Sequence, residues 1–134
     1  MPPATQQTLV GPYFAYQDLL RRAAETEGLG SLSPDQLALL TLIGRHWFEG
    51  SPLSVRRLMQ MRELASPATV HKRLHALKNI ELVDFAESAA DSRKRMIVPG
   101  SKAIAYFTSA SSAILQAAMQ HGERTADAAR EEKG

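Results

Sequence analysis

The sequence predicts a mainly α-helical fold of the α+β class with one small β-hairpin. Apolar residues recur every three or four positions in five segments, which is the spacing of amphipathic helices. Two Ser-Pro pairs, Ser33-Pro34 and Ser66-Pro67, combine a capping residue with a proline at the first helical position. Over 82–98 the helical spacing gives way to two short apolar runs on either side of a polar loop, the pattern of a hairpin.

The N-terminal helix is expected over 12–27. Tyr13, Tyr16 and Leu19 follow helical spacing, and Gly28 marks the end of the helix. Residues 1–11 contain prolines, polar residues and a glycine, so an irregular start is expected there.

The second helix starts with a capping-box pattern, in which Ser33 is followed three residues later by Gln36. Its wide apolar face extends to Phe48, and the segment 49–52 contains the glycine and proline that stop it. Ser54 is positioned to cap a short third helix.

The fourth helix follows Ser66-Pro67 and has a single narrow apolar stripe formed by Val70, Leu74 and Leu77. It is expected to end near Asn79. A short helix, a capped helix and a hairpin in this order are the layout of a winged helix-turn-helix.

After the fourth helix, strands are expected over 82–85 and 95–98, with a loop over 87–92. A last helix is expected over 101–121, and the charged tail over 122–134 leaves helix, frayed helix and disorder open. The expected organisation is one domain over 1–134, with a winged-helix core over 33–100 between an N-terminal and a C-terminal dimerisation helix.

Composition limits the function classes. The 134 residues are 44% hydrophobic and contain no cysteine, which excludes disulfide scaffolds and thiolate metal sites. The sequence has no signal-peptide pattern and no apolar run of membrane-spanning length, so a cytoplasmic protein without membrane contact is expected. Residues 51–102 carry ten Lys and Arg against five Asp and Glu, as a polyanion-binding surface requires, although an unevenly charged surface is the alternative.

The fourth helix has the two faces that a DNA-reading helix needs, because the side opposite its apolar stripe is small, polar and free of acids from Ser66 to Asn79. The basic run Arg93-Lys94-Arg95 falls one hairpin later, where it can reach a minor groove or flanking phosphates. An ordinary amphipathic surface helix is the alternative interpretation. The candidate DNA-binding residues are Ser66, Ala68, Thr69, His71, Lys72, Arg73, His75, Lys78, Arg93, Lys94 and Arg95.

The segment from Leu53 to Arg95 resembles the MarR-type winged-helix regulators. The resemblance rests on the runs LSVRRLM, SPATVHKRLHALKNIELV and DSR. It implies that the middle run is the recognition helix followed by the first wing strand, that Arg93 enters a minor groove, and that Asp91 helps to hold the wing. Glu81 occupies a position where that family usually has glycine, and the C-terminal part is shorter than usual.

The resemblance also implies a homodimer joined through the terminal helices, with two recognition helices about 34 Å apart, one turn of DNA. The terminal helices are more apolar than one small core needs, although they can also close only their own core. The candidate interface residues are Tyr13, Phe14, Tyr16, Ile104, Phe107, Ile114, Leu115 and Met119.

The sequence therefore predicts a homodimeric, sequence-specific regulator that binds double-stranded DNA, with helix 67–79 in the major groove and wing 87–95 at the minor groove. Two alternatives stay open: a non-specific or architectural DNA-binding protein of replication or partition, and a winged-helix protein-interaction module. No enzyme, cofactor or metal is expected. His71 and His75 form at most half a zinc site, because no carboxylate or cysteine lies near them in the sequence. No residues are assigned to a small-molecule effector, which the resemblance leaves open.

Overall fold

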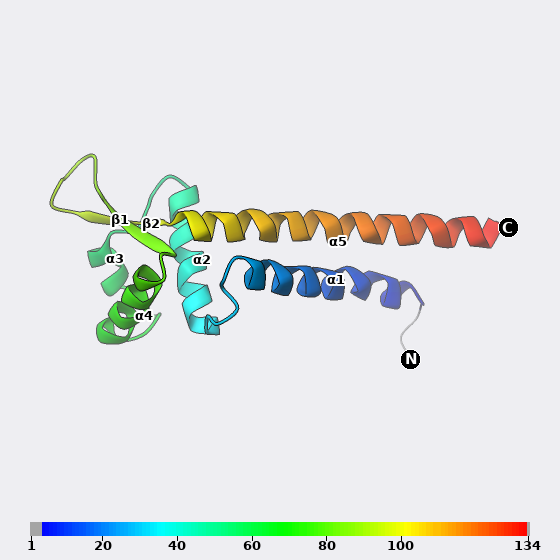
Figure 1. Ribbon diagram of the computed structural model, residues 1–134, viewed down its shortest axis with the longest axis horizontal. Coiled ribbons are helices and arrows are strands. Elements are labelled where there is room, and N and C mark those ends of the chain that lie inside the picture. The colour runs from blue at the N-terminus through cyan, green and yellow to red at the C-terminus, as the bar shows by residue number, and fades with distance from the viewer. Residues whose placement is uncertain (1–3, 134) are drawn as a thin grey trace. The chain divides into compact units, whose positions relative to one another are not determined.

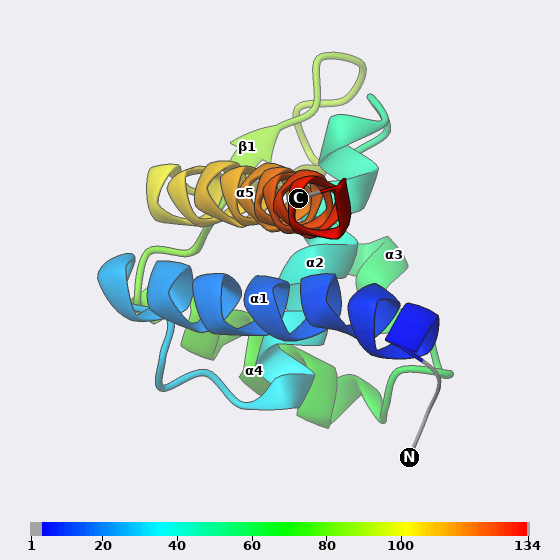
Figure 2. The same cartoon turned by 90° about the vertical axis from the view of Figure 1, so that its right-hand side faces the viewer.

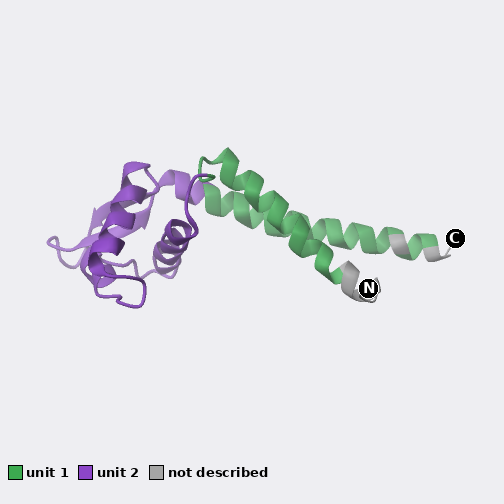
Figure 3. Ribbon diagram, turned by 90° about the horizontal axis from the view of Figure 1, so that it is seen from below, with its two compact units in different colours: residues 1–30, 106–134 green, residues 31–105 purple. Residues whose placement is uncertain are grey.

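A computed structural model describes residues 4–133, and it describes side chains at 9–127 and 129–131. The elements are α1 (Ala4–Thr26), α2 (Pro34–Phe48), α3 (Val55–Met59), α4 (Pro67–Asn79), β1 (Val83–Glu87), β2 (Arg95–Pro99) and α5 (Ser101–Lys133) (Figure 1). The chain divides into two compact units, residues 31–105 and residues 1–30 with 106–134 (Figure 3). α5 begins in the first of these units and continues in the second.

The unit formed by residues 31–105 has an aliphatic core. α2 packs against α4 and β2, and α3 packs against α4 and β2. The stripe predicted for α4 is buried at Val70, Leu74 and Leu77. The other fully buried large side chains come from the helices and strands around it and are Leu40, Ile43, Leu58, Leu82, Val83 and Ile97. This packing fixes which side of α4 remains exposed.

The helix starts predicted from serine are confirmed. Ser33 Oγ accepts a hydrogen bond from Gln36 N at 3.1 Å, and Gln36 Oε1 accepts one from Ser33 N at 3.0 Å, which completes a capping box. Ser54 caps α3, because its Oγ accepts from Arg57 N at 3.0 Å. Ser66 Oγ accepts from Thr69 N at 3.3 Å at the start of α4.

The hairpin is antiparallel, with Val83 opposite Pro99 and Glu87 opposite Arg95. A main-chain contact also ties it to the segment before α3, because Ile97 N donates to Leu53 O at 2.7 Å. The wing and α3 are therefore held together by backbone as well as by side-chain packing.

One close backbone approach lies where the hairpin meets the turn after α4. Gly100 N donates to Leu82 O at 2.9 Å. A Cβ atom on Gly100 would lie 2.5 Å from Glu81 O, so the turn requires glycine at position 100. Glu81 itself has a φ of 64°, the left-handed conformation that glycine adopts at no steric cost. This backbone conformation accounts for the preference for glycine at position 81 that the resemblance implies.

In the other unit α1 and α5 run side by side and antiparallel (Figures 1 and 3). Small and aromatic side chains of α5 are buried there, at Tyr106, Ala113 and Ala117. Ser109 Oγ donates to Glu27 Oε1 at 3.5 Å across the pair. Burial raises the pKa of the Tyr106 hydroxyl, and the nearby Tyr16 raises it further.

Both terminal helices are longer than predicted. The irregular start expected over 1–11 is wrong from Ala4 onward, because α1 begins there and includes Pro12, while residues 1–3 lie outside the described residues. The side of α1 that carries Gly11, Pro12 and Ala15 is half-buried, so packing within this unit offsets the hydrogen bond that proline removes.

The tail expected to start at residue 122 is helical. α5 continues without interruption to Lys133, as its side view in Figure 1 shows, and Figure 2 looks along it from the C-terminal end. Alanine, glutamate, arginine and lysine dominate the segment and favour helix without an apolar stripe. Although α5 has 33 residues, no helix of the described chain combines the length and apolar character needed to cross a membrane.

Candidate nucleic-acid interface

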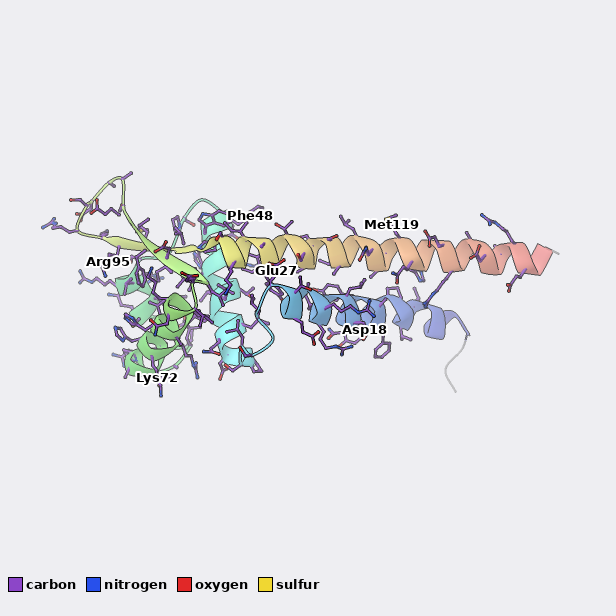
Figure 4. All side chains as sticks on the ribbon, viewed as in Figure 1. Asp18, Glu27, Phe48, Lys72, Arg95 and Met119 are labelled. Atoms are coloured by element: carbon purple, nitrogen blue, oxygen red, sulfur yellow. The ribbon has the colours of Figure 1, made fainter. Side chains whose placement is uncertain are left out.

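The exposed side of α4 is the first part of the candidate interface. Ala68, His71, Lys72 and His75 are exposed there, opposite the buried stripe, as the helical spacing predicts. Lys72 lies on the outer side of the helix (Figure 4). The helix carries no acid, and Ala68 lets a ligand approach the backbone near its N-terminus. This face therefore offers donors and positive charge without a competing carboxylate on the same helix.

Two predicted DNA-binding cations are held in ion pairs at the borders of this face. Arg73 Nη2 lies 3.3 Å from Asp35 Oδ2, and its side chain is only 30% exposed. Lys78 Nζ lies 2.8 Å from Asp84 Oδ1. Ion pairs at the protein surface contribute at most about 1 kcal/mol each, so a phosphate can compete for either cation. Thr69 is half-buried and bonds to Ser66 Oγ, so Ser66 and Thr69 mainly organise the start of the helix.

The hydrogen bond from Lys78 lowers the pKa of the Asp84 carboxyl, and the hydrogen bond from Phe85 N lowers it further. The same lysine lies 5.8 Å from the centre of the Phe85 ring, and Arg95 Cζ lies 5.7 Å from it. Phe85 therefore makes cation–π contacts with one cation from α4 and one from β2.

The wing tip is ordered by Asp91, in agreement with the role that the resemblance implies. Asp91 Oδ1 accepts from Arg93 N at 3.0 Å and from Arg93 Nε at 3.3 Å. Lys94 N donates to Asp91 O at 3.0 Å, and Ser88 N donates to Lys94 O at 3.1 Å. The Arg93 side chain is 91% exposed, so its guanidinium reaches into solvent from a fixed turn.

A cleft of about 880 Å³ lies between α3 and the wing. Arg56, Arg57 and Gln60 line it from α3, and Arg93, Lys94 and Arg95 line it from the wing, with Asp91 as its one acid. Its walls are joined by the hydrogen bond from Ile97 N to Leu53 O. Such a cleft is suited to a chain of phosphates, because five cations face one shared space.

Comparisons place this architecture among known proteins. No family profile matches the sequence, and no curated protein matches it in sequence. Among solved structures, a point mutant of MepR from a multidrug-resistant S. aureus clinical isolate is 14% identical, covers 99% of this chain and 91% of its own, and has a TM-score of 0.63. A S. aureus MepR–DNA complex is 14% identical over 87% of this chain and 82% of its own, also with a TM-score of 0.63.

The transcriptional regulator Tm0710 from Thermotoga maritima is 18% identical, covers 97% of this chain and 92% of its own, and has a TM-score of 0.58. These proteins are winged-helix regulators of the MarR type. The chain has the MarR-type winged-helix fold. The predicted fold class is confirmed, including the helix order and the antiparallel hairpin.

Sequence reasoning assigned the wing and α4 but missed the part of the cleft that α3 lines. Arg56 and Arg57 stand in the run LSVRRLM, which was visible in the sequence, yet nothing local shows that the α3 arginines and the wing share one space. Of the assigned residues, Arg93, Lys94 and Arg95 lie in the cleft, whereas His71 and Lys72 lie on the exposed side of α4.

The two histidines of α4 make direct contact. Nε2 of His71 and Nε2 of His75 are 3.1 Å apart, and the ring centres are 4.2 Å apart. The His75 ring also lies 6.4 Å from the Phe85 ring. Within the described residues no group of three or more His, Cys, Asp or Glu side chains is placed to hold a metal ion.

The predicted dimer residues of α1 and α5 are mostly exposed in the single chain. Five of them are each more than half exposed, namely Tyr13, Phe14, Ile114, Leu115 and Met119, and Ile104 is 39% exposed. Tyr16 and Phe107 are half-buried. The helices thus bury small residues within the unit and leave several large apolar side chains outside, as at Met119 (Figure 4).

Proposed function

We propose that this chain is a sequence-specific regulator of transcription that binds double-stranded DNA as a homodimer in the cytoplasm. The observation that carries the proposal is that one compact unit combines an acid-free exposed face on α4 with a cleft between α3 and the wing that five cations line. The fold shared with winged-helix regulators, one of them in complex with DNA, supports the same function. The proposal includes no catalytic step.

In the proposed complex α4 enters the major groove. His71, Lys72 and His75 would face base edges, where donors distinguish one base pair from another. Arg73 and Lys78, at the borders of the helix, would exchange their carboxylate partners for phosphates. Base preference is therefore expected to depend on the exposed centre of α4.

The cleft would hold one phosphate backbone. Arg56 and Arg57 approach it from α3, and Lys94 and Arg95 from the wing, while Arg93 extends from the tip toward the adjacent minor groove. The four residues that line the cleft along the backbone contact no base edge in this arrangement, so they contribute affinity and register more than sequence preference; they are Arg56, Arg57, Lys94 and Arg95.

A second copy of this chain would cover the apolar side chains that α1 and α5 leave exposed. The large apolar side chains exposed on α1 and α5 are more numerous than the single, scattered ones that are normal on a protein surface. They are Tyr13, Phe14, Ile114, Leu115 and Met119. A dimer of this kind would present two α4 helices to two half-sites about one turn of DNA, or roughly 34 Å, apart.

The decisive experiment is selection from a random duplex pool, repeated at low and higher salt. Enrichment of an inverted repeat is expected. Binding that falls steeply with salt and enriches no sequence would instead indicate an architectural DNA-binding protein. Absence of binding at both salt concentrations would refute DNA binding and favour a protein-interaction module.

Variants divide the interface into its two parts. Lys72→Ala or His75→Ala should change the preferred DNA sequence. The double variant Arg56→Ala, Arg57→Ala should weaken binding to all duplexes alike, and it should lower the slope of log affinity against log salt concentration by about 2. Lys102→Ala removes an exposed cation outside the cleft and is the matched control. If the control lowers affinity and salt slope as much as the double variant, the cleft is not the backbone site.

Dimerisation is tested by sedimentation at micromolar concentration. Leu115→Glu should shift the protein toward monomer, because a charge would replace an exposed apolar side chain that the partner copy buries. Gln116→Glu, at the neighbouring exposed position, should leave the dimer intact. A wild-type protein that is strictly monomeric refutes the two-half-site arrangement.

A further inference from the structure

The contact between His71 and His75 supports an inference beyond DNA binding. Both side chains are exposed on the regular part of α4, one turn apart, with their Nε2 atoms 3.1 Å from each other. Two imidazoles in this position either share a hydrogen bond, which requires opposite tautomers, or direct two lone pairs at one point, which requires a proton on each Nδ1. The second state is a preformed pair of metal ligands.

We propose that His71 and His75 form a two-histidine site for a divalent transition-metal ion. With metal–nitrogen bonds of about 2.0–2.1 Å, two nitrogens on a tetrahedral zinc ion lie about 3.3 Å apart. Two adjacent nitrogens on a square-planar copper or an octahedral nickel ion lie about 2.9 Å apart. The observed 3.1 Å lies between these values, so a small adjustment of the two rings reaches either geometry.

Both rings are exposed to solvent, and the helix that carries them is fixed to the core. Leu74 and Leu77 anchor the opposite side of the helix in the core, and the Phe85 ring lies 6.4 Å from His75. Of the nearby cations, Lys78 is paired with Asp84 at 2.8 Å, and Arg95 lies over Phe85. Preorganised ligands on a rigid helix lose little entropy when the ion binds.

Imidazole nitrogens select the class of ion. Cu²⁺, Ni²⁺ and Zn²⁺ favour such ligands, with Cu²⁺ bound most tightly, whereas Mg²⁺ and Ca²⁺ favour oxygen. Two protein ligands leave the remaining positions for water or for an outside ligand. If the proposed function is correct, those positions face DNA, whose phosphate oxygens and purine N7 atoms can complete the coordination. This consequence rests on the proposed function, whereas metal binding by the free protein does not.

The test is calorimetric titration of the untagged protein with CuCl₂, NiCl₂ and ZnCl₂ in the absence of DNA. One ion per chain is expected, with Cu²⁺ tightest and no binding of MgCl₂. His71→Gln and His75→Gln should each weaken Cu²⁺ binding by about tenfold or more, because even an outer-shell partner of a metal site is worth that much. His121→Gln on α5 is the matched control and should bind as the wild type does.

Electron paramagnetic resonance of the Cu²⁺ complex gives an independent readout, because the spectrum reports the number of nitrogen ligands. Two imidazole nitrogens are expected in the wild type and one in either α4 variant. Absence of binding, a single nitrogen in the wild type, or equal losses in the His121→Gln variant would overturn the proposal. Because none of these measurements uses DNA, failure of the metal site leaves the proposed function standing, and the converse also holds.

Discussion

Replacing Gly100 by alanine tests the backbone approach that connects the wing to the turn after α4. A Cβ atom built on Gly100 lies 2.5 Å from Glu81 O and 3.4 Å from the carbonyl carbons of Glu81 and Leu82. The nearest atom belongs to backbone, so it cannot move aside as a flexible side chain does. The peptides around it are also fixed, because Glu81 N donates to Lys78 O and Leu82 N donates to Leu77 O, both at 3.0 Å.

The expected loss of stability follows from these contacts. Inserting one methyl group into a packed site usually costs about 1–3 kcal/mol. Losing the bond from Gly100 N to Leu82 O would add about 1 kcal/mol, and the lower entropy of the unfolded alanine chain returns about 0.4–1 kcal/mol. We expect a net loss of about 2 kcal/mol, and for a chain of this length that lowers Tm by roughly 8 °C.

The assay is thermal and urea unfolding followed by circular dichroism at one fixed protein concentration, since stability depends on concentration if the protein dimerises. Gly122→Ala is the matched control, because a Cβ atom there meets nothing within 4 Å. That variant should gain about 0.5–1 kcal/mol through better helix propensity. A Gly100→Ala protein as stable as the wild type would refute the reasoning, and equal losses in both variants would show that the Glu81 contact is not the cause.

Three further measurements probe the same unit. Ser66→Ala should lower stability by about 1 kcal/mol in urea unfolding, because the cap that accepts from Thr69 N at 3.3 Å is lost, and an unchanged midpoint would contradict it. Glu81→Gly should raise Tm slightly, since relief of the φ of 64° exceeds the added entropy of the unfolded chain. The pKa of the Asp84 carboxyl is lower in the folded protein than the ordinary aspartate value of 3.8. The pairing of Asp84 with Lys78 therefore contributes its full stabilisation of the folded state above pH 3.8, and this contribution is lost as the pH falls through the lower folded pKa. The stability difference between wild type and Asp84→Asn should therefore shrink in strong acid, and a constant difference would show that the charge plays no part.

Local signals were sufficient for most of the fold. Serine and proline at helix starts act through short hydrogen bonds within four residues, so Ser33, Ser54 and Ser66 predicted their caps correctly. The buried stripe of α4 follows from spacing alone, because Val70, Leu74 and Leu77 can share only one side of a helix.

The missed features depend on contacts between distant segments. The local breakers Gly11 and Pro12 predicted that α1 starts late, but packing on one side of the helix overrides that preference. Residues 122–133 lack an apolar stripe, and the prediction from periodicity gave too little weight to their high helix propensity. Arg56 and Arg57 line a cleft with the wing cations only because the hairpin lies beside α3, and no local sequence pattern encodes that arrangement.

The same backbone contacts link stability to the candidate interface. The position of β2 is fixed at one end by the bond from Ile97 N to Leu53 O, which leads into α3, and at the other by the packing of Gly100 on Glu81, which follows α4. Both walls of the cleft and the exposed face of α4 are thus held to one strand of five residues. A displacement of that strand would change the spacing between the wing cations and those of α3. The glycine at position 100 therefore constrains the geometry of the proposed phosphate site even though it carries no charge. If the proposed function is correct, its substitution should weaken DNA binding at temperatures where the protein is still folded.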